Sequence, residues 1–157
     1  DTQKNEYIDL TIPKVMHKKQ LHKIIHDIDE NKSTLSKVLI LDDEQIYIDS
    51  WTKTLKQDQS NVDIVSFSDI DDLFDSLDRG KLRDIDFFIV DRYLKYYDSV
   101  KNNLVGDLRK RYHIKSPIIL MTNAIPDHRG FNAYIDKRPR TLSELRSILI
   151  SENDRTV

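Results

Sequence analysis

KVLILD, at residues 37–42, is the first of four short apolar runs that decide the fold of this 157-residue chain. The other three are VDIVSF (62–67), DFFIVD (86–91) and PIILMT (117–122). Three of the four are unbroken blocks of Val, Ile, Leu and Phe, which is typical of strands covered on both faces of a parallel sheet. The run at 62–67 alternates more and is expected nearer a sheet edge, and NAYID (132–136) is a fifth, weaker run.

Segments with helical spacing separate the apolar runs. In the second segment, Ser68 is expected as the N-cap and Gly80 as the residue that ends the helix. In the last segment, Thr141 and Glu144 have the spacing of a capping box. Strands that alternate with helices predict parallel βαβ units and a three-layer α/β domain beginning near Ser36. The predicted apolar helix faces consist of Ile48, Trp51 and Leu55; Ile70, Leu73, Phe74 and Leu77; Val100, Leu104, Val105, Leu108 and Tyr112; and Leu142, Leu145, Ile148 and Leu149.

The composition excludes several classes of function. Charged residues make up 33% of the chain and nearly cancel to a net charge of −2, so we expect no direct nucleic-acid partner, which would need a basic face. No apolar run approaches the roughly 20 residues that cross a bilayer, so we expect no membrane contact by this segment. The absence of cysteine fits a cytoplasmic location, including the cytoplasmic part of a membrane-bound protein. With only three glycines, phosphate chemistry would have to rely on side chains and a metal.

Polar residues follow the predicted strands where each one ends. Asp42 and Asp43 follow the first strand, Asp91 ends the third, Thr122 ends the fourth and Lys137 follows the fifth. Ligands of open parallel sheets bind beyond these carboxyl ends, so we expect the five side chains to converge. Clustered carboxylates need a compensating cation, and Mg²⁺ prefers oxygen ligands. A carboxylate can also attack phosphorus to give an acyl phosphate, whose oxygens a metal and a lysine stabilise. The competing interpretation, helix capping by Asp after a strand, applies best to Asp43 alone.

At these residues the chain resembles the receiver domains of two-component response regulators and hybrid histidine kinases, from Lys37 to about Ser151. The matching motifs are VLILDDE (38–44), FFIVD (87–91), ILMT (119–122) and YIDK (134–137). The resemblance implies a flavodoxin-like α/β fold, with a five-stranded parallel sheet in the order 2-1-3-4-5.

The resemblance also implies the roles of the site residues. Asp91 would be the phosphoacceptor. Mg²⁺ would bind Asp43, Asp91 and the backbone carbonyl of Tyr93, with Asp42 acting mainly through water. Lys137 would pair with Asp91 before phosphorylation and with the phosphoryl oxygens after it.

Two further residues would carry the switch that the resemblance implies. Thr122 would move toward the phosphoryl group, and Tyr134 would turn inward behind it. The partner would be a histidine kinase or a histidine phosphotransfer protein that supplies the phosphoryl group. An isolated domain of this kind is not a conventional enzyme.

The sequence departs from the receiver pattern after the phosphoacceptor. Most receivers have a Met-Pro pair and a glycine there, whereas this chain continues with Arg92, Tyr93 and Leu94. A side chain two residues past Asp91 can shield the phosphoryl group from water, so Tyr93 predicts slow dephosphorylation. A metal-dependent phosphatase on a related fold would need a second Asp at the position of Tyr93, which argues against that class.

The stretch before Lys137 differs as well. Only 14 residues separate Thr122 from Lys137, and they include Pro126 and Gly130, which are poor in a helix interior. The fourth helix is therefore expected to be shortened or missing. Arg138 also stands between Lys137 and the proline that normally follows the lysine directly, which can alter the turn that positions Lys137. These departures keep an alternative open, a pseudo-receiver that binds other proteins without phosphorylation.

Three segments are expected along the chain. Residues 1–35 form an N-terminal extension or linker, residues 36–153 the receiver, and residues 154–157 a tail. Within the extension, YIDLTIPK (7–14) resembles the last strand of a histidine-kinase ATP-binding domain, and a polar, helical linker follows it at 15–31. The chain would then be the C-terminal end of a hybrid histidine kinase, an interpretation placed slightly ahead of a free-standing regulator.

Overall fold

The computed structural model describes residues 36–123 and 130–156, with side chains described as far as Ser151. The predicted extension at 1–35, with its strand and helix, lies outside these residues.

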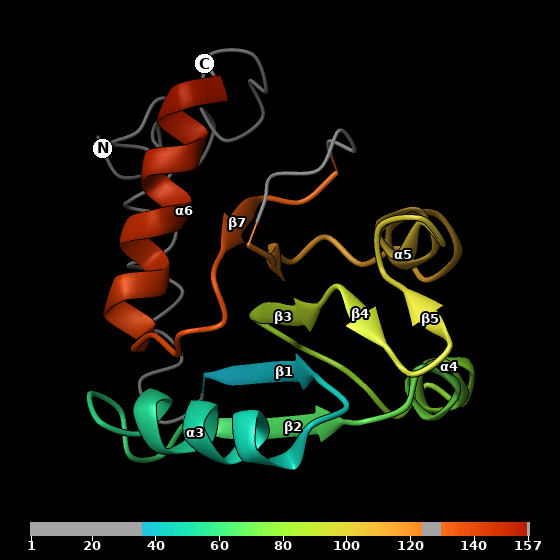
Figure 1. The fold of residues 1–157 in the computed structure, drawn as a ribbon, viewed down its shortest axis with the longest axis horizontal. Helices are drawn as coiled ribbons and strands as arrows, with labels where there is room; N and C mark the ends of the chain where they lie inside the picture. Colours follow the sequence, from blue (N-terminus) through green and yellow to red (C-terminus); the bar gives the residue numbers. More distant parts are fainter. Residues whose placement is uncertain (1–35, 124–129, 157) are drawn as a thin grey trace, which may run out of the picture.

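The described residues are built around one parallel sheet (Figure 1). Its strand order, β2-β1-β3-β6-β7, is the order 2-1-3-4-5 expected from the sequence. The more alternating run forms β2, which is an edge strand and the least buried of the five, as expected. The strands are β1 (Lys37–Leu41), β2 (Asp63–Phe67), β3 (Phe87–Asp91), β6 (Ile118–Met121) and β7 (Ala133–Ile135).

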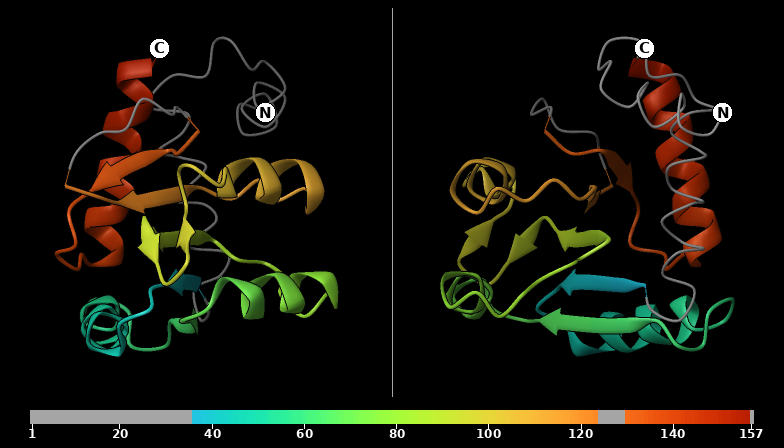
Figure 2. Two further views of the ribbon diagram at one scale, coloured as in Figure 1. Left: turned by 45° about the vertical axis from the view of Figure 1, so that its right-hand side comes forward. Right: turned by 180° about the vertical axis from the view of Figure 1, so that it is seen from behind.

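Helices cover both faces of the sheet and complete three layers. Figures 1 and 2 show α3 (Gln45–Leu55) and α6 (Leu142–Thr156) on one side, and α4 (Ile70–Asp78) and α5 (Leu104–Gly106) on the other. Two apolar clusters match the two faces: Trp51 belongs to the first and Leu73 to the second, and both side chains are fully buried. Among residues 36–123 and 130–156, no helix is long and apolar enough to span a bilayer.

The helix ends agree with the sequence in one case and differ in another. Thr141 and Glu144 form the expected capping box, because the Thr141 N–H donates to Glu144 Oε1 at 3.1 Å and the Glu144 N–H donates to Thr141 Oγ1 at 3.2 Å. The N-cap of α4 is Asp69 rather than Ser68. Its extended backbone lets its carboxylate accept from the Asp71 N–H at 2.7 Å, which leaves Ser68 one residue outside the helix.

The segment between β3 and β6 differs most from expectation. A two-stranded hairpin, β4 (Tyr93–Leu94) and β5 (Tyr97–Asp98), follows β3 directly. The single helix expected over 100–112 starts only at Leu104, because Asn103 has a left-handed backbone (φ 54°) and caps it. After α5 the helix widens into the π-helical segment η2 (Asp107–Arg111).

Between β6 and β7, none of the described residues (122–123 and 130–132) is helical, in agreement with a shortened or missing fourth helix. Residues 124–129 lie outside the described part of the chain.

Candidate functional site

The carboxyl ends of β1, β3, β6 and β7 meet at one edge of the sheet, as the topology requires. They border an open cleft of about 490 Å³. The residues that line it are Asp43, Glu44, Asp91, Arg92, Tyr93, Met121, Thr122, Asn123 and Lys137.

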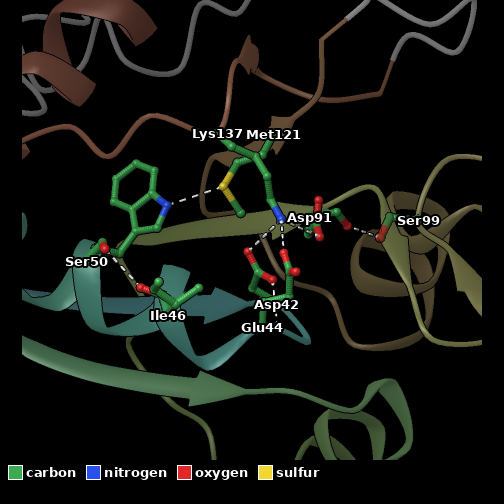
Figure 3. Close-up of polar contacts among 9 residues, drawn as sticks. Asp42, Glu44, Ile46, Ser50, Asp91, Ser99, Met121 and Lys137 are labelled. Atoms are coloured by element: carbon green, nitrogen blue, oxygen red, sulfur yellow. Dashed lines mark hydrogen bonds and ion pairs between the residues drawn. The ribbon is translucent and has the colours of Figure 1, made fainter.

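Lys137 lies at the centre of an acidic cluster, as Figure 3 shows. Its Nζ is 3.1 Å from Asp91 Oδ2, 3.3 Å from Asp42 Oδ2 and 3.3 Å from Glu44 Oε2. The same Nζ lies 4.0 Å from the centre of the Tyr47 ring, a cation–π distance. Burial opposes the charge of the ammonium, but the hydrogen bond and charge of Asp91 outweigh it and raise the pKa of Lys137. Lys137 is therefore a permanent cation at neutral pH.

Asp91 is buried at the end of β3, with 7% of its surface exposed. Burial, and then the charge of Asp42, raise the pKa of Asp91 to about 6, although Lys137 acts in the opposite direction. Its carboxylate is thus ionised at neutral pH but poorly compensated, which suits a group that gains from a second cation.

Asp42 lies beneath the cleft, fully buried. Its Oδ1 accepts from the Glu44 N–H at 2.9 Å. Its Oδ2 is close enough to Lys137 for an ion pair, but it has no hydrogen-bond partner among the described residues. Burial also raises the pKa of Asp42. A water bound to a cation in the cleft would satisfy the remaining hydrogen-bonding capacity of this buried oxygen.

The donor set fits Mg²⁺. Carboxylate oxygens of Asp42, Asp43 and Glu44 lie within 4.8 Å of one another, and Asp43 and Asp91 both line the cleft. All of these ligands are hard oxygens, which Mg²⁺ prefers, and Asp42 can reach the ion through a water. Lys137 and Arg92 are the cations that line the cleft, and Arg92 is paired with Asp98, so the four carboxylates leave a net negative charge that a divalent cation would offset.

The hairpin after β3 is hydrogen-bonded to the end of that strand. Ser99, fully buried, donates its hydroxyl to the Asp91 carbonyl at 2.7 Å, and its N–H donates to the Arg92 carbonyl at 2.7 Å. Arg92 is 3.4 Å from Asp98 Oδ1 across the hairpin. Hydrogen-bonded and non-hydrogen-bonded pairs alternate along an antiparallel ladder, and Arg92 and Ser99 form a hydrogen-bonded pair. The next pair, Tyr93 and Asp98, is therefore non-hydrogen-bonded, so the ladder does not use the Tyr93 carbonyl. The unexpected hairpin therefore forms no ladder hydrogen bond to the Tyr93 carbonyl, which is the predicted metal ligand.

No family model matches the sequence, and no curated protein matches it. Among solved structures, a two-component response regulator from Cytophaga hutchinsonii has a TM-score of 0.58 at 15% identity, over 76% of this chain and 97% of that one. A CheY-like receiver domain protein from Methanospirillum hungatei has a TM-score of 0.54 at 17% identity, over 77% and 98%. The phosphorylated cyanobacterial phytochrome response regulator RcpA has a TM-score of 0.54 at 17% identity, over 74% and 89%. The chain has the receiver fold.

The receiver fold brings together most of the residues singled out from the sequence. Asp43, Asp91, Thr122 and Lys137 line one cleft, and Asp42 lies directly beneath it. Tyr134, in β7, is half-buried and does not line the cleft. Its ring meets the ring of Phe131 edge-on, with centroids 5.9 Å apart.

The contacts that Tyr47 and Ser99 make with this site were not predicted. Glu44, in contrast, ends the motif VLILDDE (38–44), so the sequence already placed it beside the acidic pair. Tyr47 lies in the first turn of α3, and its contact depends on the position of Lys137, which no local sequence pattern encodes. Ser99 reaches Asp91 only because the hairpin brings it there, and the hairpin itself had no sequence signal.

Proposed function

We propose that this receiver takes up a phosphoryl group on Asp91 from the phosphohistidine of a histidine kinase or histidine phosphotransfer protein, in the cytoplasm and with Mg²⁺. The observation that carries the proposal is the position of Lys137, whose Nζ lies 3.1 Å from Asp91 Oδ2 at the centre of an acidic cleft.

The groups present can perform the transfer. A carboxylate oxygen of Asp91 attacks phosphorus, the bond from phosphorus to the histidine nitrogen breaks, and the imidazole leaves with the electron pair. Lys137, already charged, then moves its hydrogen bond from Asp91 to an oxygen of the phosphoryl group. Bound by Asp43, Asp91 and the Tyr93 carbonyl, with Asp42 acting through water, Mg²⁺ would supply further positive charge to those oxygens.

The proposed switch uses the residues next to the acceptor. Thr122 lines the cleft beside Asp91, where its hydroxyl can donate to a phosphoryl oxygen. Its N–H is bonded to the Ile135 carbonyl at 2.7 Å, so a movement of Thr122 reaches β7 and Tyr134 directly.

The second candidate is a pseudo-receiver that binds proteins without phosphorylation. The hairpin at 93–98 favours it, because this hairpin replaces the usual loop beside the acceptor. The excess of carboxylates in the cleft favours the phosphate-accepting receiver. Repulsion among these carboxylates lowers the stability of the fold, and a role in binding a metal or a phosphoryl group gives a reason to retain them.

Incubation of the wild-type protein with acetyl phosphate, with and without Mg²⁺, separates the two candidates. We expect intact-mass measurement to show one phosphate adduct that forms in Mg²⁺ and not in excess chelator. A wild-type protein that gains no phosphate and shows no stabilisation by Mg²⁺ would establish the pseudo-receiver instead.

Replacing Tyr93 by alanine is expected to shorten the lifetime of the acyl phosphate several-fold. Tyr93 lines the mouth of the cleft, where its ring restricts the approach of water to phosphorus. The decay of the phosphate adduct after removal of the donor measures the lifetime. Tyr96→Ala is the matched control, since Tyr96 is 95% exposed on the same hairpin and does not line the cleft. An unchanged or longer lifetime in Tyr93→Ala would count against a shielding role.

A further inference from the structure

The turn that carries Lys137 is held by a buried arginine. Residues 136–141 connect β7 to α6, and Arg140 near the end of this turn is only 7% exposed. Its Nη1 donates to the carbonyl of Asp136 at 3.0 Å and to the carbonyl of Arg138. Its Nη2 is 3.0 Å from Asp136 Oδ1.

Asp136 completes the arrangement from the other end of the turn. Its Oδ1 accepts from the Arg138 N–H at 2.9 Å as well as from Arg140. This backbone hydrogen bond, and then the charge of Arg140, lower the pKa of Asp136, so its carboxylate stays ionised at neutral pH.

These bonds fix the backbone on both sides of Lys137. The Asp136 carbonyl belongs to the peptide unit before Lys137, and the Arg138 N–H belongs to the unit after it. Each peptide unit is rigid, so fixing both of them fixes the direction in which the Lys137 side chain leaves the backbone. An ordered lysine side chain loses rotamer entropy, and a backbone that already aims it at its partner leaves less to lose.

We propose that Arg140 and Asp136 form a clasp that positions Lys137 for its contact with Asp91. In this chain Arg138 separates Lys137 from Pro139, so the proline ring does not restrain the backbone directly after the lysine. The clasp provides that restraint instead. Its consequence for phosphate uptake rests on the function proposed above, whereas its effect on Lys137 itself does not.

The first test compares Arg140→Met in two backgrounds. We expect the rate of phosphorylation by acetyl phosphate to fall by about tenfold to a hundredfold, as for a misplaced reacting group. In a Lys137→Met background, Arg140→Met should cause no further loss, because it acts through Lys137. The control is Arg138→Met, which removes an exposed neighbouring arginine whose side chain is not part of the clasp. No loss in the wild-type background, or an equal loss in both backgrounds, would overturn the inference.

The second test needs no phosphate. The protein is labelled with acetic anhydride, and peptide mass spectrometry compares the rate of acetylation of Lys137 with that of exposed Lys53. Lys137 should react more slowly than Lys53 in the wild type and several-fold faster after Arg140→Met, but not after Arg138→Met.

Asp136→Ala is the second variant, in case Arg140→Met does not fold, because the Asp136 side chain is 57% exposed. Like Arg140→Met, it should accelerate the labelling of Lys137. If the wild type takes up no phosphate, the proposed function fails while the labelling still decides the clasp. Unchanged labelling of Lys137 in the clasp variants would overturn the clasp.

Discussion

Replacing Asp91 by asparagine is expected to abolish phosphate uptake and to leave the protein folded and more stable. The amide has nearly the shape of the carboxylate but cannot attack phosphorus. Burial raises the pKa of Asp91 from 3.8 to about 6, so its ionised form is disfavoured in the folded protein. At 1.36 kcal/mol per pKa unit, removal of this charge should raise the free energy of unfolding by about 1–3 kcal/mol without Mg²⁺.

The increase in the free energy of unfolding caused by Asp91→Asn should be present at high pH and disappear as the pH is lowered. Because the folded pKa of Asp91 lies above the unfolded value, its ionisation costs the wild type stability above about pH 6, and the cost disappears as the pH falls toward 3.8. Denaturant unfolding of both proteins at pH 8 and pH 4 measures the difference. Asp75→Asn, an exposed carboxylate paired with Arg79 on α4, is the control and should take up phosphate like the wild type. A phosphate adduct on Asp91→Asn would contradict the assignment of the acceptor.

Replacing Lys137 by methionine is expected to slow phosphorylation by about 10²–10³-fold, the cost of removing one group that stabilises a developing oxyanion. Stability should fall as well, because Lys137 is the cation in contact with Asp42 and Asp91. Removing one partner of a buried ion pair costs about 3–5 kcal/mol, and Lys137 is 27% exposed, so we expect about 1–3 kcal/mol here.

Mg²⁺ should restore part of this loss, since a divalent cation compensates the same carboxylates. Acetyl-phosphate kinetics and denaturant unfolding with and without Mg²⁺ measure both effects. Lys53→Met, which removes an exposed lysine on α3, should change neither. Equal rates and equal stabilities for Lys137→Met and the wild type would show that Lys137 has no part in the site.

The sequence predicted the sheet well because its signals are local and its geometry is constrained. Apolar runs placed the five strands, and the parallel connections then required their carboxyl ends to share one edge. That rule alone was enough to bring Asp43, Asp91 and Lys137 to one cleft. The edge position of β2 followed from its alternating pattern in the same way.

The segment after Asp91 was not predictable by the same means. The hairpin at 93–98 depends on the Arg92–Asp98 ion pair and on Ser99 bonding back to Asp91, contacts that helical or strand periodicity does not reveal. The helix expected over 100–112 was placed too early, because the left-handed backbone of Asn103 starts it at Leu104. The clasp of Arg140 on Asp136 was also invisible, since a buried arginine has the same sequence signature as an exposed one.

Borohydride reduction of the phosphorylated protein tests the central claim most directly. Reduction converts an aspartyl phosphate to homoserine, so peptide mass spectrometry identifies the residue that carried the phosphoryl group. We predict homoserine at position 91 after treatment with acetyl phosphate and Mg²⁺, and none without the phosphodonor. Homoserine at another aspartate, or none in a protein that has taken up phosphate, would contradict the assignment of Asp91 as the phosphoacceptor.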